Sequence, residues 1–287
     1  MGKVKIVTDS TADIPAELQK ELDITVVPLK VHFAEETYED GVNLTADQFY
    51  TKLAEAESIP TTSQPTPHQF ETEYRQLFEK VDKPDIISIH LSSKLSGTFQ
   101  SAYIASQTLG DEVPVTVVDS KRASYAIGII VVEVAALAKE GASKEECLER
   151  VNELLEDTSV FFMVDTLEYL EKNGRIGKAS AVLGSLLKIK PILSLTKEGE
   201  VYPFEKVRGQ KKAVNRIIQE FQDRYGRDDI HVGISHAQSE SEAEALMKQM
   251  HEHFSIKKET ITSIGPVIGT HVGPGTVSVS VTRLKNS

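Results

Sequence analysis

Apolar and polar positions follow two different periods along the first half of the chain. Short apolar runs predict buried strands at residues 4–8, 24–33, 86–91 and 113–118. Between them, apolar residues at helical spacing predict helices that begin near Pro15, cover residues 45–56 and run through Phe70, Tyr74 and Leu77. Strands that alternate with helices are typical of a mostly parallel, doubly wound sheet, so this half is expected to be an α/β domain.

The most apolar stretch lies in the middle of the chain. Residues 124–156 predict two helices broken at Gly141, and the window 125–138 contains one charged residue, Glu133. This window is too short to cross a bilayer, so it predicts a buried helix. The lone cysteine, Cys147, falls on the second helix, where we expect a half-buried structural thiol.

The pattern changes near Ser159. Further apolar runs predict strands at residues 161–164, 191–195, 201–204, 230–235, 255–264 and 276–282. The Lys-Glu-Gly-Glu segment at 197–200 fits a hairpin turn, so part of this second sheet should be antiparallel. We therefore expect an N-terminal α/β domain at 1–158 with a doubly wound, mostly parallel sheet, and a C-terminal α/β domain at 159–287 with a mixed sheet.

Length and charge narrow the class of protein. A chain of 287 residues is long enough for two domains. The net charge of −11 argues against nucleic-acid binding and allows only transient contact with an anionic membrane. A single cysteine excludes an intramolecular disulfide, and no signal-peptide pattern precedes the first strand, so we expect a cytoplasmic protein.

The segment that follows the strand at 86–91 is the most informative. Residues 92–101 read Ser-Ser-Lys-Leu-Ser-Gly-Thr-Phe-Gln-Ser, a hydroxyl-rich loop without Asp or Glu that opens a helix, with Ser96 at the expected N-cap. Loops at the C-terminal ends of strands bind ligands in α/β sheets, and helix N-termini attract anions. The segment predicts a site for a small anionic group; a plain helix cap in a surface loop is the alternative.

Three other segments carry candidate chemistry. Residues 59–67 combine three prolines with four hydroxyl residues, which predicts either a stiff binding loop or a rigid connector. The turn at 7–13 either faces the ligand crevice or uses its Asp residues as caps. The glycine-rich segment 264–276 predicts turns around His271, which is either a structural hydrogen-bonding residue or a donor to an anion.

Two basic elements complete the candidates. Arg175 and Lys178 come just after a helix predicted near 167–172, and Arg208 lies between a strand and the next helix. Arginine suits carboxylate and phosphate recognition, and solvated charge near a helix end is the alternative. The sequence has no P-loop, dinucleotide-binding or nucleophile-elbow motif and no Cys/His metal spacing. We therefore predict no cofactor, metal or catalytic residue.

Four motifs occur in order along the chain: residues 62–65 (Thr-Ser-Gln-Pro), 92–98 (Ser-Ser-Lys-Leu-Ser-Gly-Thr), 174–177 (Gly-Arg-Ile-Gly) and 269–275 (Gly-Thr-His-Val-Gly-Pro-Gly). In these motifs the chain resembles the DegV family, bacterial fatty-acid-binding proteins that work with a fatty acid kinase. The resemblance covers about residues 3–284. It implies two α/β domains with a long-chain fatty acid, such as palmitate, buried between them.

The resemblance also implies roles for particular residues. Those that match the family's carboxylate contacts are Thr62, Ser96, Thr61, Ser93, Gly97 and His271. Arg208 matches a position associated with the kinase partner, and Arg175 is a second candidate for the same surface. Asn173 stands where many relatives carry glycine; because Asn tolerates left-handed φ, the turn should survive. The apolar candidates for the tunnel wall are Phe161, Phe162, Met163, Leu183, Leu186, Leu187, Ile192, Val267 and Ile268.

The resemblance implies a non-catalytic carrier with a role in lipid transport. Such a carrier presents the carboxylate to a separate fatty acid kinase and retains the acyl phosphate until an acyltransferase takes it. The alternative is a hydrolase or phosphotransferase for a small anionic substrate, with Ser96 or Ser93 as nucleophile and His271 as base. A lipid-responsive regulator is a third interpretation, against which the acidic charge and the lack of a helix-turn-helix signal count.

Overall fold

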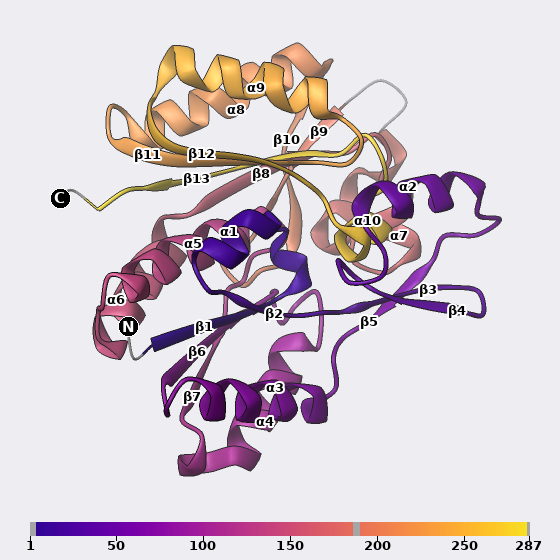
Figure 1. Ribbon diagram of the computed structural model, residues 1–287. Coiled ribbons are helices and arrows are strands. Elements are labelled where there is room, and N and C mark those ends of the chain that lie inside the picture. Colours follow the sequence, from indigo (N-terminus) through magenta and orange to yellow (C-terminus); the bar gives the residue numbers. More distant parts are fainter. Residues whose placement is uncertain (1–3, 186–189, 286–287) are drawn as a thin grey trace.

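The computed structural model describes residues 4–185 and 190–285. Within them, one layer of helices lies between a parallel sheet and a mixed sheet, and further helices cover the outer face of each sheet (Figure 1). The α/β fold class predicted from the sequence, with a mostly parallel first sheet and a mixed second sheet, is confirmed. Single-turn or short 3₁₀ segments lie at η1 (Ser10–Ala12), η2 (Gly110–Glu112) and η3 (Gly177–Ser185).

Four described strands form the parallel sheet. Their order is β2 (Thr25–Val27), β1 (Val4–Asp9), β6 (Asp85–His90) and β7 (Val115–Asp119). The helices α3 (Pro67–Lys80) and α4 (Thr98–Leu109) cover the outer face of this sheet (Figure 1). Helix α3 begins with a capping box at Thr66 and Gln69 and has Pro67 in its first turn, where a missing N–H costs little.

The mixed sheet contains six described strands. Their order is β10 (Val201–Val207), β9 (Lys190–Leu195), β8 (Ser159–Met163), β13 (Val277–Arg283), β11 (Asp229–His236) and β12 (Ser255–Ser263). Only the β11–β12 pair is parallel, and the hairpin predicted at 197–200 joins β9 to β10. The helices α8 (Gln210–Tyr225) and α9 (Glu240–His253) cover the outer face (Figure 1).

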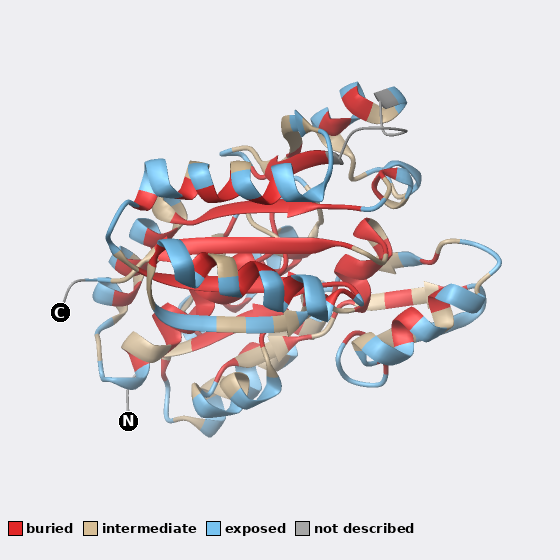
Figure 2. Cartoon of the chain, turned by 90° about the horizontal axis from the view of Figure 1, so that it is seen from above, coloured by how far each residue is buried: buried red, intermediate tan, exposed pale blue. Residues whose placement is uncertain are grey.

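The middle layer contains the apolar helix predicted from the sequence. It consists of α1 (Ala16–Glu21), α5 (Tyr125–Lys139) and α6 (Lys144–Asp157). Helix α5 contacts β1 on one side and β11 and β13 on the other, and 12 of its 15 residues are buried. Buried residues gather in the interior of the fold, and the exposed ones lie mainly on its outer helices and loops (Figure 2). Cys147 on α6 is fully buried, not half-buried as we expected, because it faces α5 and the core.

One charged group of α5 is buried against the mixed sheet. Glu133 Oε1 lies 2.9 Å from His231 Nδ1 and 2.9 Å from Lys258 Nζ. Burial alone would raise the pKa of Glu133, but the hydrogen bonds with His231 and Lys258 outweigh it and hold the pKa below its usual value. Glu133 therefore ties the middle layer to β11 and β12 as an ion.

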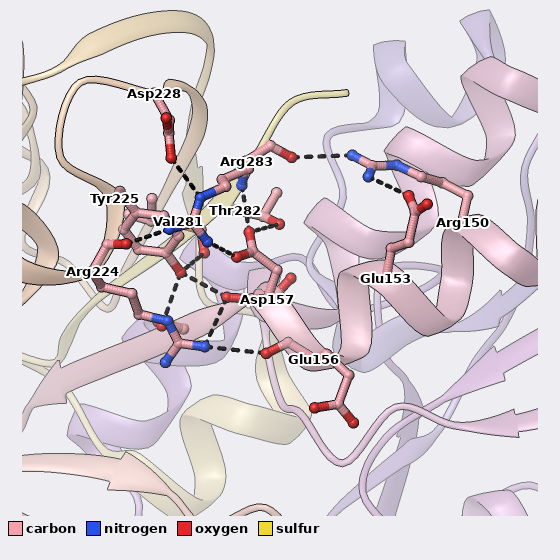
Figure 3. Close-up of polar contacts among 12 residues, drawn as sticks. Arg150, Glu153, Glu156, Asp157, Arg224, Tyr225, Asp228, Val281, Thr282 and Arg283 are labelled. Carbon is pink, nitrogen blue, oxygen red and sulfur yellow. Dashed lines mark hydrogen bonds and ion pairs between the residues drawn. The ribbon is translucent and has the colours of Figure 1, made fainter. Parts of the chain in front are cut away.

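Arginine side chains stabilise the connection between α6 and β8 (Figure 3). Arg224 Nη2 donates to the Glu156 and Asp157 carbonyls at 3.1 Å each, and the Arg283 guanidinium pairs with the Asp157 carboxylate. Arg150 Nη2 donates to the Arg283 carbonyl at 3.1 Å. The domain boundary expected near Ser159 coincides with the first residue of β8. The division into separate domains stays a prediction, since α5 packs on both sheets.

A small antiparallel sheet corrects two expectations. It has the order β4 (Glu36–Glu39), β3 (Lys30–Phe33) and β5 (Thr61–Ser63). The single strand expected at 24–33 is wrong: it divides at Pro28 into β2 and β3, and the Leu29 N–H donates to Ser10 Oγ instead of continuing a ladder. The loop expected at 59–67 contains β5. Sequence reasoning missed β4 altogether.

The expectation of glycine-rich turns at 264–276 is also partly wrong. Residues Pro266–Val272 form the helix α10, which packs against α2 (Ala46–Glu55), α7 (Glu168–Lys172) and the small sheet (Figure 1). Pro266 suits the first helical position. Gly269 permits close packing, because a Cβ there would lie 2.7 Å from Phe49 Cε1 and 2.7 Å from the Tyr50 hydroxyl oxygen.

Candidate functional site

A largely apolar cavity lies between the parallel and mixed sheets. Its empty volume is about 850 Å³, which includes space open to solvent. The apolar residues that line it are Leu29, Leu91, Leu95, Ala123, Val160, Phe162, Leu170, Leu195, Val201, Ile264, Val267, Ile268 and Val272. The polar residues that line it are Thr62, Gln64, Ser96, Ser124, Arg175, His271, Thr276 and Ser278.

Two predicted residues meet in the wall of this cavity. Thr62 Oγ1 of β5 and His271 Nε2 of α10 lie 2.9 Å apart in a hydrogen bond. The buried Nδ1 atom of His271 has no partner among the described residues. Burial, together with the nearby positive charge of Arg175, lowers the pKa of His271 to about 4, so the imidazole is neutral at pH 7.

Ser96 also lines the cavity, although its local role differs from the one we expected. The N-cap of α4 is Gly97, not Ser96. Ser96 Oγ instead accepts a hydrogen bond from Thr98 N at 3.3 Å and lies 2.9 Å from Thr98 Oγ1. The Ser96 hydroxyl therefore bonds the first N–H of α4, and Ser96 also lies in the wall of the cavity.

The loop that carries Ser96 is fastened from both sheets. The Ser92 carbonyl accepts from the N–H groups of Leu95 and Ser96, and Ser92 Oγ donates to the Gly199 carbonyl at 2.9 Å. Gly199 lies at the tip of the β9–β10 hairpin with φ at +90°. A Cβ at Gly199 would lie 2.9 Å from Ser92 Cβ and 3.0 Å from Lys121 Cα, so only glycine fits there.

Arg175 lies in the cavity wall, although sequence comparison suggested a partner surface. Its Nε donates to the Leu95 carbonyl at 3.1 Å and its Nη1 to the Asn173 carbonyl at 2.6 Å. The turn before Arg175 forms, but Asn173 does not adopt the left-handed φ that we expected of it. Asn173 has φ −90°, and Gly174 takes the left-handed conformation. Asn173 Nδ2 donates to the Thr270 carbonyl, which joins this turn to α10.

Four other predicted residues lie outside the cavity wall. Thr61 is exposed, since neighbours on a strand point to opposite faces. Ser93 Oγ donates to Asp119 Oδ2 at 2.6 Å instead of facing the cavity. Gly97 packs on Gln64, whose Nε2 would lie 2.7 Å from a Cβ at Gly97. Arg208 is exposed just beyond β10, where a partner could reach it.

Sequence reasoning missed four polar lining residues: Gln64, Ser124, Thr276 and Ser278. Gln64 could have been found, because residues two apart on an extended segment share a face and Gln64 follows Thr62 by two. The other three carry no local signal. They come from the start of α5 and from β13 and the turn before it, and only the tertiary fold joins them.

Some of the apolar residues predicted for the tunnel wall line the cavity, and the others lie in the core. Phe162, Val267 and Ile268 line the cavity as predicted. Phe161, Met163 and Ile192 do not, because they face the opposite side of the mixed sheet and pack among α8 and α9. Leu183 packs against the core without lining the cavity, and Leu186 and Leu187 lie outside the described residues.

The hydrogen bonds of Ser96 and His271 bear on the hydrolase alternative. His271 Nε2 contacts Thr62, and Ser96 Oγ contacts Thr98, so no serine–histidine pair forms there among the described residues. This geometry gives no support to the hydrolase alternative. Across residues 4–185 and 190–285, no cluster of His, Cys, Asp or Glu could hold a metal ion, and no helix is long and apolar enough to cross a bilayer.

A serine, a histidine and an aspartate do form a series elsewhere in the fold. Ser88 Oγ lies 2.6 Å from His90 Nε2, and His90 Nδ1 lies 2.9 Å from Asp9 Oδ2. Tyr74 OH donates to Ser88 Oγ at 2.7 Å. All four side chains are fully buried between the parallel sheet and α3, so no substrate reaches the serine. The series braces β1 against β6.

Together, the layers and the cavity define an α/β protein with a mostly apolar cavity between its two large sheets and several polar side chains in the wall of that cavity. Comparison with known proteins agrees with this class. The family model described as "Uncharacterised protein, DegV family" matches residues 3–284, and the chain belongs to the DegV family.

Relatives and solved structures match the chain over almost its full length. A DegV domain-containing protein of Halalkalibacterium halodurans is 40% identical, with 98% of each chain covered. A structure described as fatty acid binding of a DegV family protein from Thermus thermophilus has a TM-score of 0.91 at 38% identity, covering 98% of this chain and 99% of that one. DegV of Bacillus subtilis, described as a fatty acid binding protein, has a TM-score of 0.87 at 34% identity, covering 99% and 100%.

Proposed function

We propose that this protein binds one long-chain fatty acid, with the tail in the cavity and the carboxylate at Thr62, Ser96 and His271. The observation that carries the proposal is the cavity itself. Its wall is mostly apolar, and it also contains the polar side chains of Thr62 from β5, His271 from α10 and Ser96 from the loop before α4. Solved DegV relatives described as fatty-acid-binding, and one from Eubacterium ventriosum described as binding stearic acid, support the choice of ligand.

The polar group suits a carboxylate. In the tautomer with the proton on Nδ1, His271 accepts from Thr62 at Nε2 and has an N–H free to donate. Arg175 supplies positive charge from the cavity wall without requiring an ionised histidine. Neutral hydroxyls and one fixed cation can hold either a carboxylate or an acyl phosphate, so one site serves both.

The apolar wall supplies most of the binding energy. Burial of about 15 methylene-sized groups contributes roughly 12 kcal/mol before the costs of association, at about 0.8 kcal/mol per group. Lost motion of the ligand reduces this sum considerably. The remainder still allows tight binding of a ligand that a partner can extract.

We assign the protein a carrier role in the cytoplasm rather than an enzymatic one. A fatty acid kinase would phosphorylate the presented carboxylate, and an acyltransferase would then take the acyl phosphate. Arg208 is the candidate contact with the kinase, because it is exposed and outside the cavity wall. Arg175 is assigned to the ligand instead.

The ligand assignment is tested by mass spectrometry. The purified protein should show a native adduct equal in mass to one long-chain fatty acid, and denaturation followed by solvent extraction should recover the same acid. If extraction yields no fatty acid and delipidated protein takes up none from vesicles or albumin, the carrier function is wrong.

Substitution of Arg208 with Ala should separate the two roles. We expect R208A to keep its fatty acid and to lower turnover by a fatty acid kinase of the same organism roughly tenfold, as for the loss of about 1.4 kcal/mol at a protein contact. Arg227→Ala is the matched control, since Arg227 is exposed and follows the other end of α8. Loss of fatty acid from R208A, or equal turnover of the two variants, contradicts the assignment.

Substitution of Gly199 with Ala should weaken fatty acid binding about tenfold. The added Cβ pushes the hairpin tip away from Ser92 and so displaces the loop that carries Ser96, and overpacking of this kind costs about 1–3 kcal/mol. Gly141→Ala is the control, because Gly141 has a similar φ of +98° and open space around its Cβ position. Titration with a fluorescent fatty acid measures both; equal affinities would show that the hairpin contact does not position the loop.

A further inference from the structure

Two buried carboxylates flank the first residues of α10. Asp13 follows η1 and Asp40 follows β4, and their side chains are 8% and 4% exposed. Both reach the same point: a Cβ on Gly265, the N-cap of α10, would lie 2.8 Å from Asp13 Oδ1 and 3.1 Å from Asp40 Oδ1. The two acids therefore meet across a glycine.

Both carboxylates hold backbone N–H groups at the start of α10. Asp13 Oδ1 accepts from Gly265 N at 2.9 Å, and Asp13 Oδ2 accepts from Ser124 Oγ at 2.5 Å. Asp40 interacts with the Ser10 side chain and with the Val267 N–H. Its buried Oδ2 atom nevertheless makes no hydrogen bond with any described residue.

No described cation balances the pair. The titratable groups that face it are Asp9 from β1 and Tyr50 from α2. Asp9 disfavours negative charge on Asp13 and Asp40, and these two acids in turn disfavour ionisation of Tyr50. Gln19, Thr262 and Ser263, which line the adjoining polar cavity from α1 and β12, are uncharged. Two unpaired carboxylates in such a place cannot both ionise without strong repulsion.

Protonation of this pair is therefore easy near neutral pH. Burial is the largest cause and raises the pKa of Asp40 to about 7; it also raises the pKa of Asp13 well above its usual value, with Asp40 adding to the effect. A carboxyl group whose pKa is higher in the folded state than in the unfolded state stabilises the fold when it is protonated. This stabilisation is fully present at pH values below the unfolded-state pKa near 4, and it is lost as the pH rises through about 7.

The pair is connected to the fatty acid site in two ways. Ser124, which donates to Asp13, also lines the fatty acid cavity. Helix α10, whose first N–H groups the pair holds, carries Val267, Ile268 and His271 into the same cavity. A change at the start of this short helix therefore reaches the carboxylate-binding histidine at its other end.

We propose that Asp13 and Asp40 form a proton-dependent anchor for α10, which holds the helix firmly when Asp40 is protonated and loosens it when Asp40 ionises beside Asp13. The ligand consequence rests on the proposed function: fatty acid should leave faster as the pH rises through neutrality. The anchor itself is a property of the protein without ligand.

Hydrogen exchange tests the anchor directly. In the delipidated protein, protection of the Gly269 and Gly273 amides, corrected for intrinsic exchange rates, should fall roughly tenfold between pH 6 and pH 8.5, because a single proton changes an equilibrium at most tenfold per pH unit. Asp40→Asn cannot ionise and should keep the low-pH protection throughout. Asp47→Asn, the same change at an exposed position on α2, should follow the unmodified protein.

Two exchange results overturn the anchor: a flat profile in the unmodified protein, or equal slopes in that protein and D40N. The first needs no variant, so a misfolded D40N does not leave the proposal open. For the ligand, the dissociation rate of cis-parinaric acid should rise with pH in the unmodified protein relative to D40N. Failure of any fatty acid to bind would contradict the carrier function alone, whereas normal binding with a flat exchange profile would contradict the anchor alone.

Discussion

Substitution of Asp9 with Asn should lower the free energy of unfolding by about 3–5 kcal/mol, because each buried donor that loses its acceptor costs about 1–3 kcal/mol. Asp9 is fully buried at the end of β1. Its Oδ1 accepts from the N–H and hydroxyl of Thr11, and its Oδ2 accepts from Leu91 N at 3.1 Å and pairs with His90 at 2.9 Å. An amide in this place turns an NH₂ group toward at least one of these donors.

The expected loss extends to the ligand site, because Leu91 begins the loop that carries Ser96. Asp119→Asn is the matched control: Asp119 ends β7 and accepts from Ser93 N, Ser93 Oγ and Lys121 N at 3.2, 2.6 and 2.9 Å, but near solvent, where water replaces lost partners. Urea unfolding should show a loss of about 1 kcal/mol or less for D119N, as for an ordinary hydrogen bond. Similar losses in both variants would mean that the buried network at Asp9 has no special role.

Substitution of Thr62 with Val should weaken fatty acid binding about 10- to 100-fold, since a hydrogen bond to a charged group contributes about 1–3 kcal/mol. Valine keeps the shape of threonine and loses only the hydroxyl. The change removes the hydroxyl that donates to His271 Nε2 at 2.9 Å, so the ring is no longer held with its Nδ1 N–H toward the carboxylate. Fluorescence titration of delipidated protein with cis-parinaric acid measures the effect.

Thr61→Val provides the matched control on the same strand. Thr61 is exposed and points away from the cavity wall, so T61V should bind as the unmodified protein does. A long-chain alcohol, which has a tail but no carboxylate, should bind T62V and T61V more nearly alike. Equal affinity of both variants for the fatty acid would place the carboxylate elsewhere in the cavity.

The layers of the fold could be predicted because the buried segments are apolar runs whose length separates strands from helices. Helix α5 and the strands β1, β6 and β11 are apolar over enough residues to be recognised in this way. The small sheet could not be predicted in the same way. Strands of three or four residues show almost no period, and β4 and β5 are made of polar side chains such as Glu36 and Thr61.

The polar end of the cavity could be predicted only in part. Motifs pointed to Thr62, Ser96 and His271, and the fold places all three in one wall. The same reasoning could not distinguish Ser93 from Ser96, because a loop of similar hydroxyls does not reveal where each side chain points. Asp40 gave no signal at all: it follows a strand that was not predicted, and its partner Asp13 is 27 residues away.

The place of β13 in the mixed sheet has a consequence for synthesis. This strand lies between β8 and β11, both of which precede it in the chain. On the ribosome, the edges of these two strands and the apolar face of α5 that β13 covers therefore stay open until residue 283 has emerged. Exposed strand edges and apolar faces are the surfaces on which unfinished chains aggregate. Until the strand that closes its sheet is made, the nascent protein therefore exposes the kind of surface that chaperones bind.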